Sequence, residues 1–294
     1  MISVNPFDAT GEWYKGNLHT HTTRSDGERS PQEVVSWYRS HGYDFLAITD
    51  HNKLTDMSAF ADSDFLTISG TEFNVGRTEM GQNYHLVGLN LPRELELSQG
   101  IDAQKTIDMI RAEGGEVIVA HPYWSGLTVN DLLPLQGPIG LEVFNTTCLR
   151  GIGKGLSSVH WDDLLTRGKL VWGFAADDAH FHRPDAGGGW IIVKAPKLTR
   201  DDIMKAIKGG LFYSSCGPEI MDLRIANDTV SVECSPVVMI HFICDLSKGK
   251  SFQAEEEGFL TGAEFKLRGE ENYLRVECID QKGRKAWTNP LFFK

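Results

Sequence analysis

Short apolar runs alternate with amphipathic segments over roughly the first 210 residues of the chain. Runs of this length, rich in β-branched and aromatic residues, are typical of buried strands. The predicted strands are WYKGNLHTH at 13–21, DFLAIT at 44–49, FLTISGTEF at 65–73, YHLVGLNL at 84–91, EVIVA at 116–120, GLEVFN at 140–145, LVWGFAA at 170–176 and WIIVKA at 190–195. Near-continuous apolar strands of this kind favour a parallel sheet that is covered by helices.

Helix signals lie between several of these strands. Ser30 and Glu33 form a capping box around Pro31, which predicts a helix from there to about Gly42. Ile101–Glu113 has apolar residues at helical spacing and ends at two glycines. A short helix is predicted at 160–168, and another at Thr199–Lys208, capped by Thr199.

About seven strands in this length fit a barrel better than an open sheet, since α/β barrels run to about 200 residues and more. Beyond about Cys216 the pattern changes to short alternating strands with tight polar turns. This change predicts a small antiparallel β-sandwich. We therefore expect a barrel at 1–216 and a β-sandwich at 217–294, divided near Gly217-Pro218.

Composition and charge narrow the class of protein. The net charge of −11 argues against general attraction to nucleic acid or to an anionic membrane. The five cysteines are scattered and none forms a Cys-x-x-Cys pair, which indicates reduced thiols. The N-terminus lacks the basic start and apolar core of a signal peptide, and the longest apolar run, Val237–Cys244, is too short to cross a bilayer. We expect a cytoplasmic enzyme.

Histidines and carboxylates gather where the predicted strands end. Because the carboxyl ends of parallel strands share one face of a barrel, we expect these side chains to converge. Imidazole and carboxylate together suit zinc, manganese, iron or nickel, and the absence of thiolates argues against a structural zinc site. Their number suits two or three divalent ions, with a metal-bound hydroxide between them. The residues are His19, His21, Asp26, His51, Glu72, His85, His121, Asp178 and His180.

The carboxylates in this set suggest the type of substrate. Glu72 is a natural bridge, because a carboxylate can offer one oxygen to each of two ions. Three divalent ions would outweigh the negative charge of Asp26, Glu72 and Asp178. A site with this net positive charge favours a dianionic phosphate over a neutral ester, and the preference weakens if only two ions bind.

Six motifs occur in the order seen in one known family: LHTHTTRSDG, AITDHN, GTEF, YHLVGL, AHP and ADDAH. With them, the chain resembles PHP-family metallohydrolases (polymerase and histidinol phosphatase) over about residues 13–182. The second part of the chain resembles a subgroup that carries a C-terminal immunoglobulin-like domain. Where the family often has a small hydroxyl residue, this chain has Asp177.

The resemblance implies a distorted (β/α)7 barrel of the TIM-like type. It also implies a ligand set for each of three ions. The first set is His19, His21, Glu72 and Asp178, the second is Glu72, His85 and His121, and the third is Asp26, His51 and His180.

Some of these residues also have ordinary structural interpretations. Asp26 alone would be a turn residue before Gly27, and His85 alone would be a strand histidine. Asp50 is expected to be structural. Near the strand ends, Arg24, Lys53, Arg150 and Arg183 can bind phosphate or remain solvated, Asn145 can reach the site or form a turn, and Tyr123 and Trp124 can line the pocket.

Three functional hypotheses follow. The first is a phosphoesterase for a small phosphorylated substrate, in which Glu72, His182 and Arg183 serve catalysis. The second is a carboxylester or carbamate hydrolase on the same metal site. The third is a binding module that recognises its partner through the sandwich. The sequence gives no indication of oligomeric state.

Overall fold

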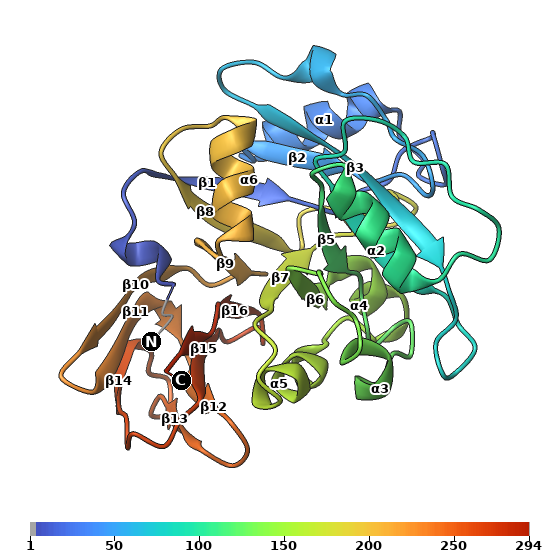
Figure 1. Cartoon of the computed structure of the whole chain (residues 1–294). Helices are drawn as coiled ribbons and strands as arrows, with labels where there is room; N and C mark the ends of the chain where they lie inside the picture. The colour runs from blue at the N-terminus through green and yellow to red at the C-terminus, as the bar shows by residue number, and fades with distance from the viewer. Residues whose placement is uncertain (1–3, 294) are drawn as a thin grey trace.

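A computed structural model describes residues 4–293 of the chain. Figure 1 shows an α/β part that contains the first two thirds of the chain and an antiparallel β part at the C-terminal end. The fold is therefore mixed α/β, as the sequence predicts. No helix among residues 4–293 combines the length and the apolar character needed to cross a membrane.

The α/β part is built on one curved sheet in the order β9-β8-β1-β2-β3-β4-β5-β6-β7. Its strands are, in chain order, β1 (Glu12–Asn17), β2 (Phe45–Ile48), β3 (Leu66–Val75), β4 (Tyr84–Leu89), β5 (Glu116–Val119), β6 (Gly140–Asn145), β7 (Trp172–Ala176), β8 (Trp190–Ala195) and β9 (Phe212–Ser215). β7, at one end of this order, lies against β9, at the other end. The Ser214 hydroxyl on β9 donates to the Gly173 carbonyl on β7 at 2.7 Å and accepts from the Ala175 N–H at 3.0 Å.

The strands are not uniformly parallel, and this part of the prediction is wrong. β1, β2 and β3 are parallel, as are β5, β6 and β7, but β4 runs antiparallel to both of its neighbours. The loop between Val75 and Tyr84 is too short for the helical crossover that a parallel strand needs, so the chain turns back as a hairpin. β8 is likewise antiparallel to β1 and β9.

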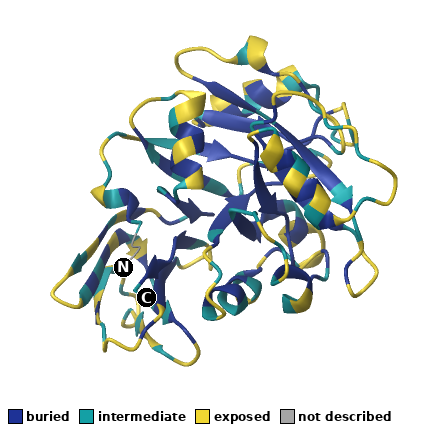
Figure 2. Ribbon diagram, in the orientation of Figure 1, coloured by how far each residue is buried: buried dark blue, intermediate teal, exposed yellow. Residues whose placement is uncertain are grey.

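The helices begin where local capping signals predict. At α1 (Pro31–Ser40), Ser30 accepts from the Glu33 N–H, and the Glu33 carboxylate accepts from the Ser30 N–H, so the predicted capping box is confirmed. At α6 (Arg200–Lys208), Thr199 caps the first turn. The other helices are α2 (Ala103–Ala112), α3 (Val129–Leu132), α4 (Thr146–Ile152) and α5 (Ser158–Thr166), with 3-10 turns η1 (Pro6–Asp8) and η2 (Ser58–Phe60). Figure 2 shows α2 and α6 with buried inner faces and exposed outer faces.

The C-terminal part is antiparallel throughout. Its strands are β10 (Ile220–Ala226), β11 (Thr229–Val237), β12 (Met239–Cys244), β13 (Gly249–Gln253), β14 (Leu260–Lys266), β15 (Tyr273–Ile279), β16 (Lys285–Thr288) and β17 (Leu291–Phe292). β10, β11 and β14 form a sheet of their own, whereas β16 pairs with β9 and thereby extends the sheet of the α/β part. Apolar residues of both sheets, such as Val232 and Val276, share one buried core.

The two parts also share a hydrophobic core. Trp287 and Phe292 belong to the same buried cluster as Phe144 and Trp161 of the α/β part. The rings of Phe144 and Trp287 lie 5.8 Å apart. The division of the chain at residue 216 remains a prediction, since both a sheet and a core continue across it.

Candidate metal centre

The two histidines of the His-x-His pair lie beyond a strand rather than on it. β1 ends at Asn17, and the next residues pair with the segment that follows β7. The His21 N–H donates to the Ala179 carbonyl, and the Asp178 N–H donates to the His19 carbonyl, both at 2.9 Å. These two bonds bring residues from the ends of β1 and β7 to one point.

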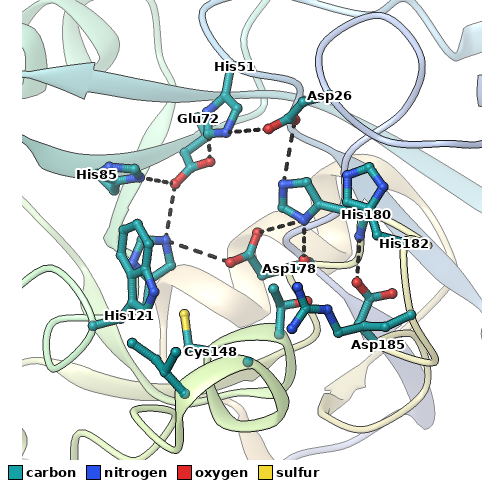
Figure 3. A pocket seen from close by; sticks show the side chains of 15 residues that line it. Asp26, His51, Glu72, His85, His121, Cys148, Asp178, His180, His182 and Asp185 are labelled. Atoms are coloured by element: carbon teal, nitrogen blue, oxygen red, sulfur yellow. Dashed lines mark hydrogen bonds and ion pairs between the residues drawn. The ribbon is translucent and has the colours of Figure 1, made fainter.

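The nine predicted ligands meet in three overlapping groups. Figure 3 labels all of these residues except His19 and His21. In each group the ligand atoms lie within 4.8 Å of one another. The groups are His19, His21, Glu72 and Asp178; Glu72, His85 and His121; and His21, Asp26, His51 and His180. The structure therefore brings the nine predicted ligands together.

Glu72 lies at the centre of this arrangement. Its Oε2 is 3.2 Å from Nε2 of both His19 and His21. Its Oε1 is 2.7 Å from Nδ1 of His85 and 3.2 Å from Nε2 of His121. Each oxygen thus faces a different group, which is the geometry of a bridging carboxylate.

The outer group is more open to solvent. Asp26 is about half exposed, and its two oxygens lie 3.5 Å from Nε2 of His180 and 3.5 Å from Nε2 of His51. His21 is shared with the buried inner group. A metal ion held by this outer group would exchange with solvent more readily than an ion held by fully buried ligands.

The charges in the site are strongly coupled. Burial lowers the pKa of His21, but contacts with Asp178 and Glu72 outweigh it and raise the pKa to about 9. Burial raises the pKa of Glu72, but His19 and other nearby rings bring it well below its usual value. The carboxylates therefore favour positive charge around them, which protonated histidines or a divalent ion can supply.

The surroundings of two atoms indicate that the possible metal-binding atoms face a common point and do not pair with one another. Nδ1 of His51 and Oε2 of Glu72 are buried and lack a hydrogen bond of suitable geometry, although they are 3.0 Å apart. Nε2 of His19 and Nε2 of His21 also face each other at 3.2 Å. Buried polar atoms are normally satisfied, so this arrangement fits a bound cation. The imidazole and carboxylate donors suit zinc, manganese or iron.

The backbone is unusual at two ligands. His121 has a φ of 26° and Asp178 a φ of 56°, both in the left-handed region. Such conformations cost roughly 1–3 kcal/mol and persist where the surrounding structure enforces them. Here they direct the two side chains into the cavity.

Sequence reasoning did not select Glu142, which supports the ligands from behind. Its Oε1 is 2.6 Å from Nδ1 of His19, and its Oε2 accepts from the His121 N–H at 2.9 Å. The Asn145 amide bridges Oε2 of Glu142, at 2.8 Å, and Oδ2 of Asp178, at 3.2 Å. The signal was a single carboxylate within the otherwise apolar strand GLEVFN.

Two further carboxylates stabilise the loops around the site. Asp50 accepts from the hydroxyls of Thr22, Ser25 and Thr55, which agrees with its expected structural role. Asp177 is fully buried and accepts from three successive backbone N–H groups at Gly187, Gly188 and Gly189. Burial raises the pKa of Asp177, and these bonds counter that shift.

The predicted ligands other than His19 and His21 line an open cavity of about 440 Å³. His182 and Arg183 also line it, and Nδ1 of His182 is 3.0 Å from the Glu28 carboxylate. Trp124 and Cys148 belong to the wall, and burial raises the pKa of the Cys148 thiol. The lining within residues 4–293 does not include Arg24, Lys53, Arg150 or Tyr123.

Sequence comparisons find two relatives, each of which matches about a third of this chain. No family model matches the chain. An uncharacterised protein of Methanocaldococcus jannaschii is 27% identical over 122 residues, which are 37% of this chain and 68% of that protein. A 5'-3' exoribonuclease of Haemophilus influenzae is 30% identical over 103 residues, which are 33% of this chain and only 37% of the exoribonuclease.

Among solved structures, one from Bacteroides vulgatus covers almost the whole chain. It is a two-domain protein that contains a predicted PHP-like metal-dependent phosphoesterase. The similarity has a TM-score of 0.51 at 13% identity and covers 96% of this chain and 87% of that chain. At this identity the similarity shows the fold, and at that level the resemblance stated from the motifs is confirmed.

Proposed function

We propose that this chain is a metal-dependent phosphoesterase that acts on a small phosphorylated molecule. The observation that carries the proposal is the convergence of six histidines and three carboxylates in three overlapping groups, with Glu72 facing two groups at once and seven of the nine residues lining one cavity. Three ionised carboxylates hold fewer charges than three divalent ions bring, so the loaded cavity is positive. A dianionic phosphoryl group matches that charge.

In this proposal the three groups of ligands each hold one ion, and zinc, manganese and iron all suit the donors. When bound, such ions act as Lewis acids on phosphoryl oxygens and activate water for attack. Glu142 fixes the ring of His19 through Nδ1, so that Nε2 is directed toward Glu72. Asn145 orients Asp178 in the same manner.

Two residues are placed to act on the substrate itself. Arg183 lines the cavity, and its guanidinium can pair with a phosphoryl oxygen. His182 lies on the same rim beside His180 and can donate a proton to the leaving oxygen.

A carboxylester or carbamate hydrolase would use the same ligands but needs a different pocket. A neutral substrate favours an apolar, aromatic wall, whereas this cavity adds the basic side chains of Arg183 and His182 to Trp124 and Ile152. The charged rim therefore supports the phosphate substrate.

We also propose the finer architecture that the sequence suggests. The strands β1 to β9 would form the distorted (β/α)7 barrel, divided near residue 216 from an immunoglobulin-like sandwich formed by β10 to β17. The apolar faces shared by the two C-terminal sheets support this arrangement. The proposed enzyme works in the cytoplasm on a small molecule.

The test uses protein loaded with manganese and two substrates, p-nitrophenyl phosphate and p-nitrophenyl acetate. We expect phosphate turnover well above acetate turnover, and its loss on treatment with chelator and in Glu72→Ala. The control is Glu233→Ala, which removes an exposed carboxylate on β11. Acetate turnover alone would support the ester reading, and phosphate turnover that survives in Glu72→Ala would rule out this site.

A further inference from the structure

Three neighbouring cavities form a cleft from the metal centre along the hairpin formed by β3 and β4, and each shares lining residues with the next. The cavity of about 440 Å³ shares His85, Trp124 and Ile152 with a second cavity of about 390 Å³. The second cavity shares Arg77 and Asn83 with a third of about 500 Å³. A substrate held by its phosphoryl group at the metal centre can therefore extend well beyond it.

Three asparagines in this cleft stand next to metal-site residues. Asn52 follows His51 in the chain, and Asn83 precedes His85 by two residues. Asn74 is two residues beyond Glu72 and lies directly opposite His85 in the β3–β4 ladder. Residues two apart along a strand share a face, so Asn74 continues the face that carries Glu72, and Asn52 and Asn83 line the same cavity as Asn74.

One member of this row has an unused hydrogen-bond acceptor, whereas Oδ1 of Asn52 already accepts from the Asn74 N–H at 3.4 Å. Oδ1 of Asn74 is buried and has no hydrogen-bond partner. The second and third cavities contain one cation, Arg77, and no Asp or Glu among their lining residues within residues 4–293, although the chain carries a net charge of −11. Side-chain amides both donate and accept, so they suit a ligand that is rich in neutral hydroxyl groups.

An aromatic ring stands where the first cavity opens into the second. Trp124 is 44% exposed, and its ring is edge-on to His85 at 5.6 Å and to His121 at 5.2 Å. The indole thus borders the metal centre while part of it remains open to a ligand. An exposed indole can cover the apolar C–H face of a saturated sugar ring, and the amides then meet the hydroxyls at its edge.

We propose that the leaving group of the substrate is a sugar or another cyclic polyol, which Trp124 and the asparagine row of Asn52, Asn74 and Asn83 bind. The substrate class is then a phosphate monoester of a polyhydroxylated ring. This inference rests on the proposed phosphoesterase function and specifies its substrate. A site that pairs with substrate hydroxyls discriminates strongly against analogues that lack them, because its buried amides are left unpaired.

The experiment compares kcat/KM of the manganese-loaded full-length protein for matched phosphates. myo-Inositol 1-phosphate and cyclohexyl phosphate share the ring but differ in hydroxyls, and glucose 6-phosphate, mannose 6-phosphate and ribose 5-phosphate extend the series. Adenosine 5'-monophosphate and p-nitrophenyl phosphate complete the panel. We expect at least one polyol or sugar phosphate to exceed cyclohexyl phosphate by at least roughly tenfold.

Two variants locate this preference in the cleft. Asn74→Leu and Asn83→Leu should each lower the ratio of polyol to cyclohexyl kcat/KM by roughly tenfold. Gln32→Leu is the matched control, because it makes the same kind of change on the exposed face of α1. Circular dichroism and thermal unfolding establish whether each variant is folded. Because two positions are substituted, the test can still be carried out if one variant is unstable.

The outcomes separate this inference from the function beneath it. Turnover of p-nitrophenyl phosphate without any preference for hydroxylated rings, or with a preference for the nucleotide, overturns the inference alone. An unchanged ratio in both folded asparagine variants also overturns it. If the loaded protein hydrolyses no phosphate ester, the proposed function fails and the inference fails with it.

Discussion

The carboxylate of Glu142 lies 2.6 Å from Nδ1 of His19, while Nε2 of the same ring faces Glu72 at 3.2 Å and Asp178 at 3.3 Å. One side of the imidazole is thus held by β6, and the other is directed toward these two carboxylates. A carboxylate behind a metal-binding histidine fixes its tautomer and raises its basicity. Glu142 performs this task with two oxygens that accept from three donors.

We predict that Glu142→Gln weakens metal binding by roughly 10–100-fold. A glutamine can accept on only one of its two terminal atoms, so at least one of the buried donors at His19, His121 and Asn145 loses its partner. Competition with a chromophoric chelator measures the affinity. Glu233→Gln on β11 is the control, and unchanged affinity in folded Glu142→Gln would contradict the positioning role.

The convergence of the predicted ligands could be anticipated from sequence, because most of them lie at or just beyond strand ends, and these ends meet whatever the details of the loops. His121 after EVIVA and Asp178 after LVWGFAA are examples. The role of the predicted ligands in binding metal remains a prediction. The role of Glu142 could not be assigned, because the function of a single carboxylate in an apolar strand depends on which residue it contacts in the folded protein. The direction of β4 depended on the loop at 76–83, whose sequence does not reveal that it contains no helix.

The continuity of the two parts of the chain was also beyond sequence reasoning. The change of pattern near Cys216 is real, but it does not reveal that β16 pairs with β9. Pairing between strands some 70 residues apart is set by packing, which local patterns do not record. Asp177 is a related case, since its role depends on a loop that turns back over it.

Metal content should depend on which carboxylate is removed. Glu72 faces two groups, so Glu72→Gln should lower the bound metal by more than one ion per chain after loading and desalting. Asp26 is half exposed and serves the outer group alone, so Asp26→Asn should lose at most one ion. Elemental analysis by mass spectrometry gives the stoichiometry. Equal losses in both variants would show that Glu72 does not bridge.

Truncation after residue 216 should yield insoluble protein. The deletion leaves one edge of β9 without its partner β16 and removes Trp287 and Phe292 from a shared core. An unpaired strand edge beside exposed apolar surface promotes aggregation. The soluble fraction after expression, compared with that of the full chain, is the measurement. A soluble, monomeric fragment would show that the first part folds independently.

Arg275 ties the C-terminal part to α5 and should be sensitive to the loss of its partner. It is 1% exposed, and its Nε and Nη2 donate to the two oxygens of Asp162 at 2.8 and 2.7 Å. Asp162→Ala leaves this guanidinium with only the Glu277 carboxylate, at 3.4 Å. We expect a loss of about 2–3 kcal/mol in the free energy of unfolding, below the usual cost at a fully buried pair because water reaches Asp162.

The neighbouring residue supplies the control for that substitution. Asp163 also lies on α5, but its ion pair with Arg167 is exposed. Asp163→Ala should therefore cost about 0.5 kcal/mol or less. Denaturant unfolding gives both values, and equal losses would mean that the buried pair contributes no more than a surface one.

Glu277 should make the C-terminal part sensitive to acid. Burial raises the pKa of its carboxyl, but Arg275 and Lys285 outweigh this and lower the pKa below its usual value of 4.5. Because the folded state binds the proton more weakly than the unfolded chain, the carboxylate stabilises the fold above about pH 4.5, and this contribution is lost as the pH falls through the folded pKa.

Glu277→Gln removes the charge but can retain the bond from the Trp287 indole N–H, which is 2.9 Å from Oε2. The variant should be less stable than the parent by about 2 kcal/mol at pH 7, and the difference should shrink below pH 4.5. Urea unfolding of both proteins between pH 3 and pH 7 tests this, and a difference that is independent of pH would exclude Glu277 as the titrating group.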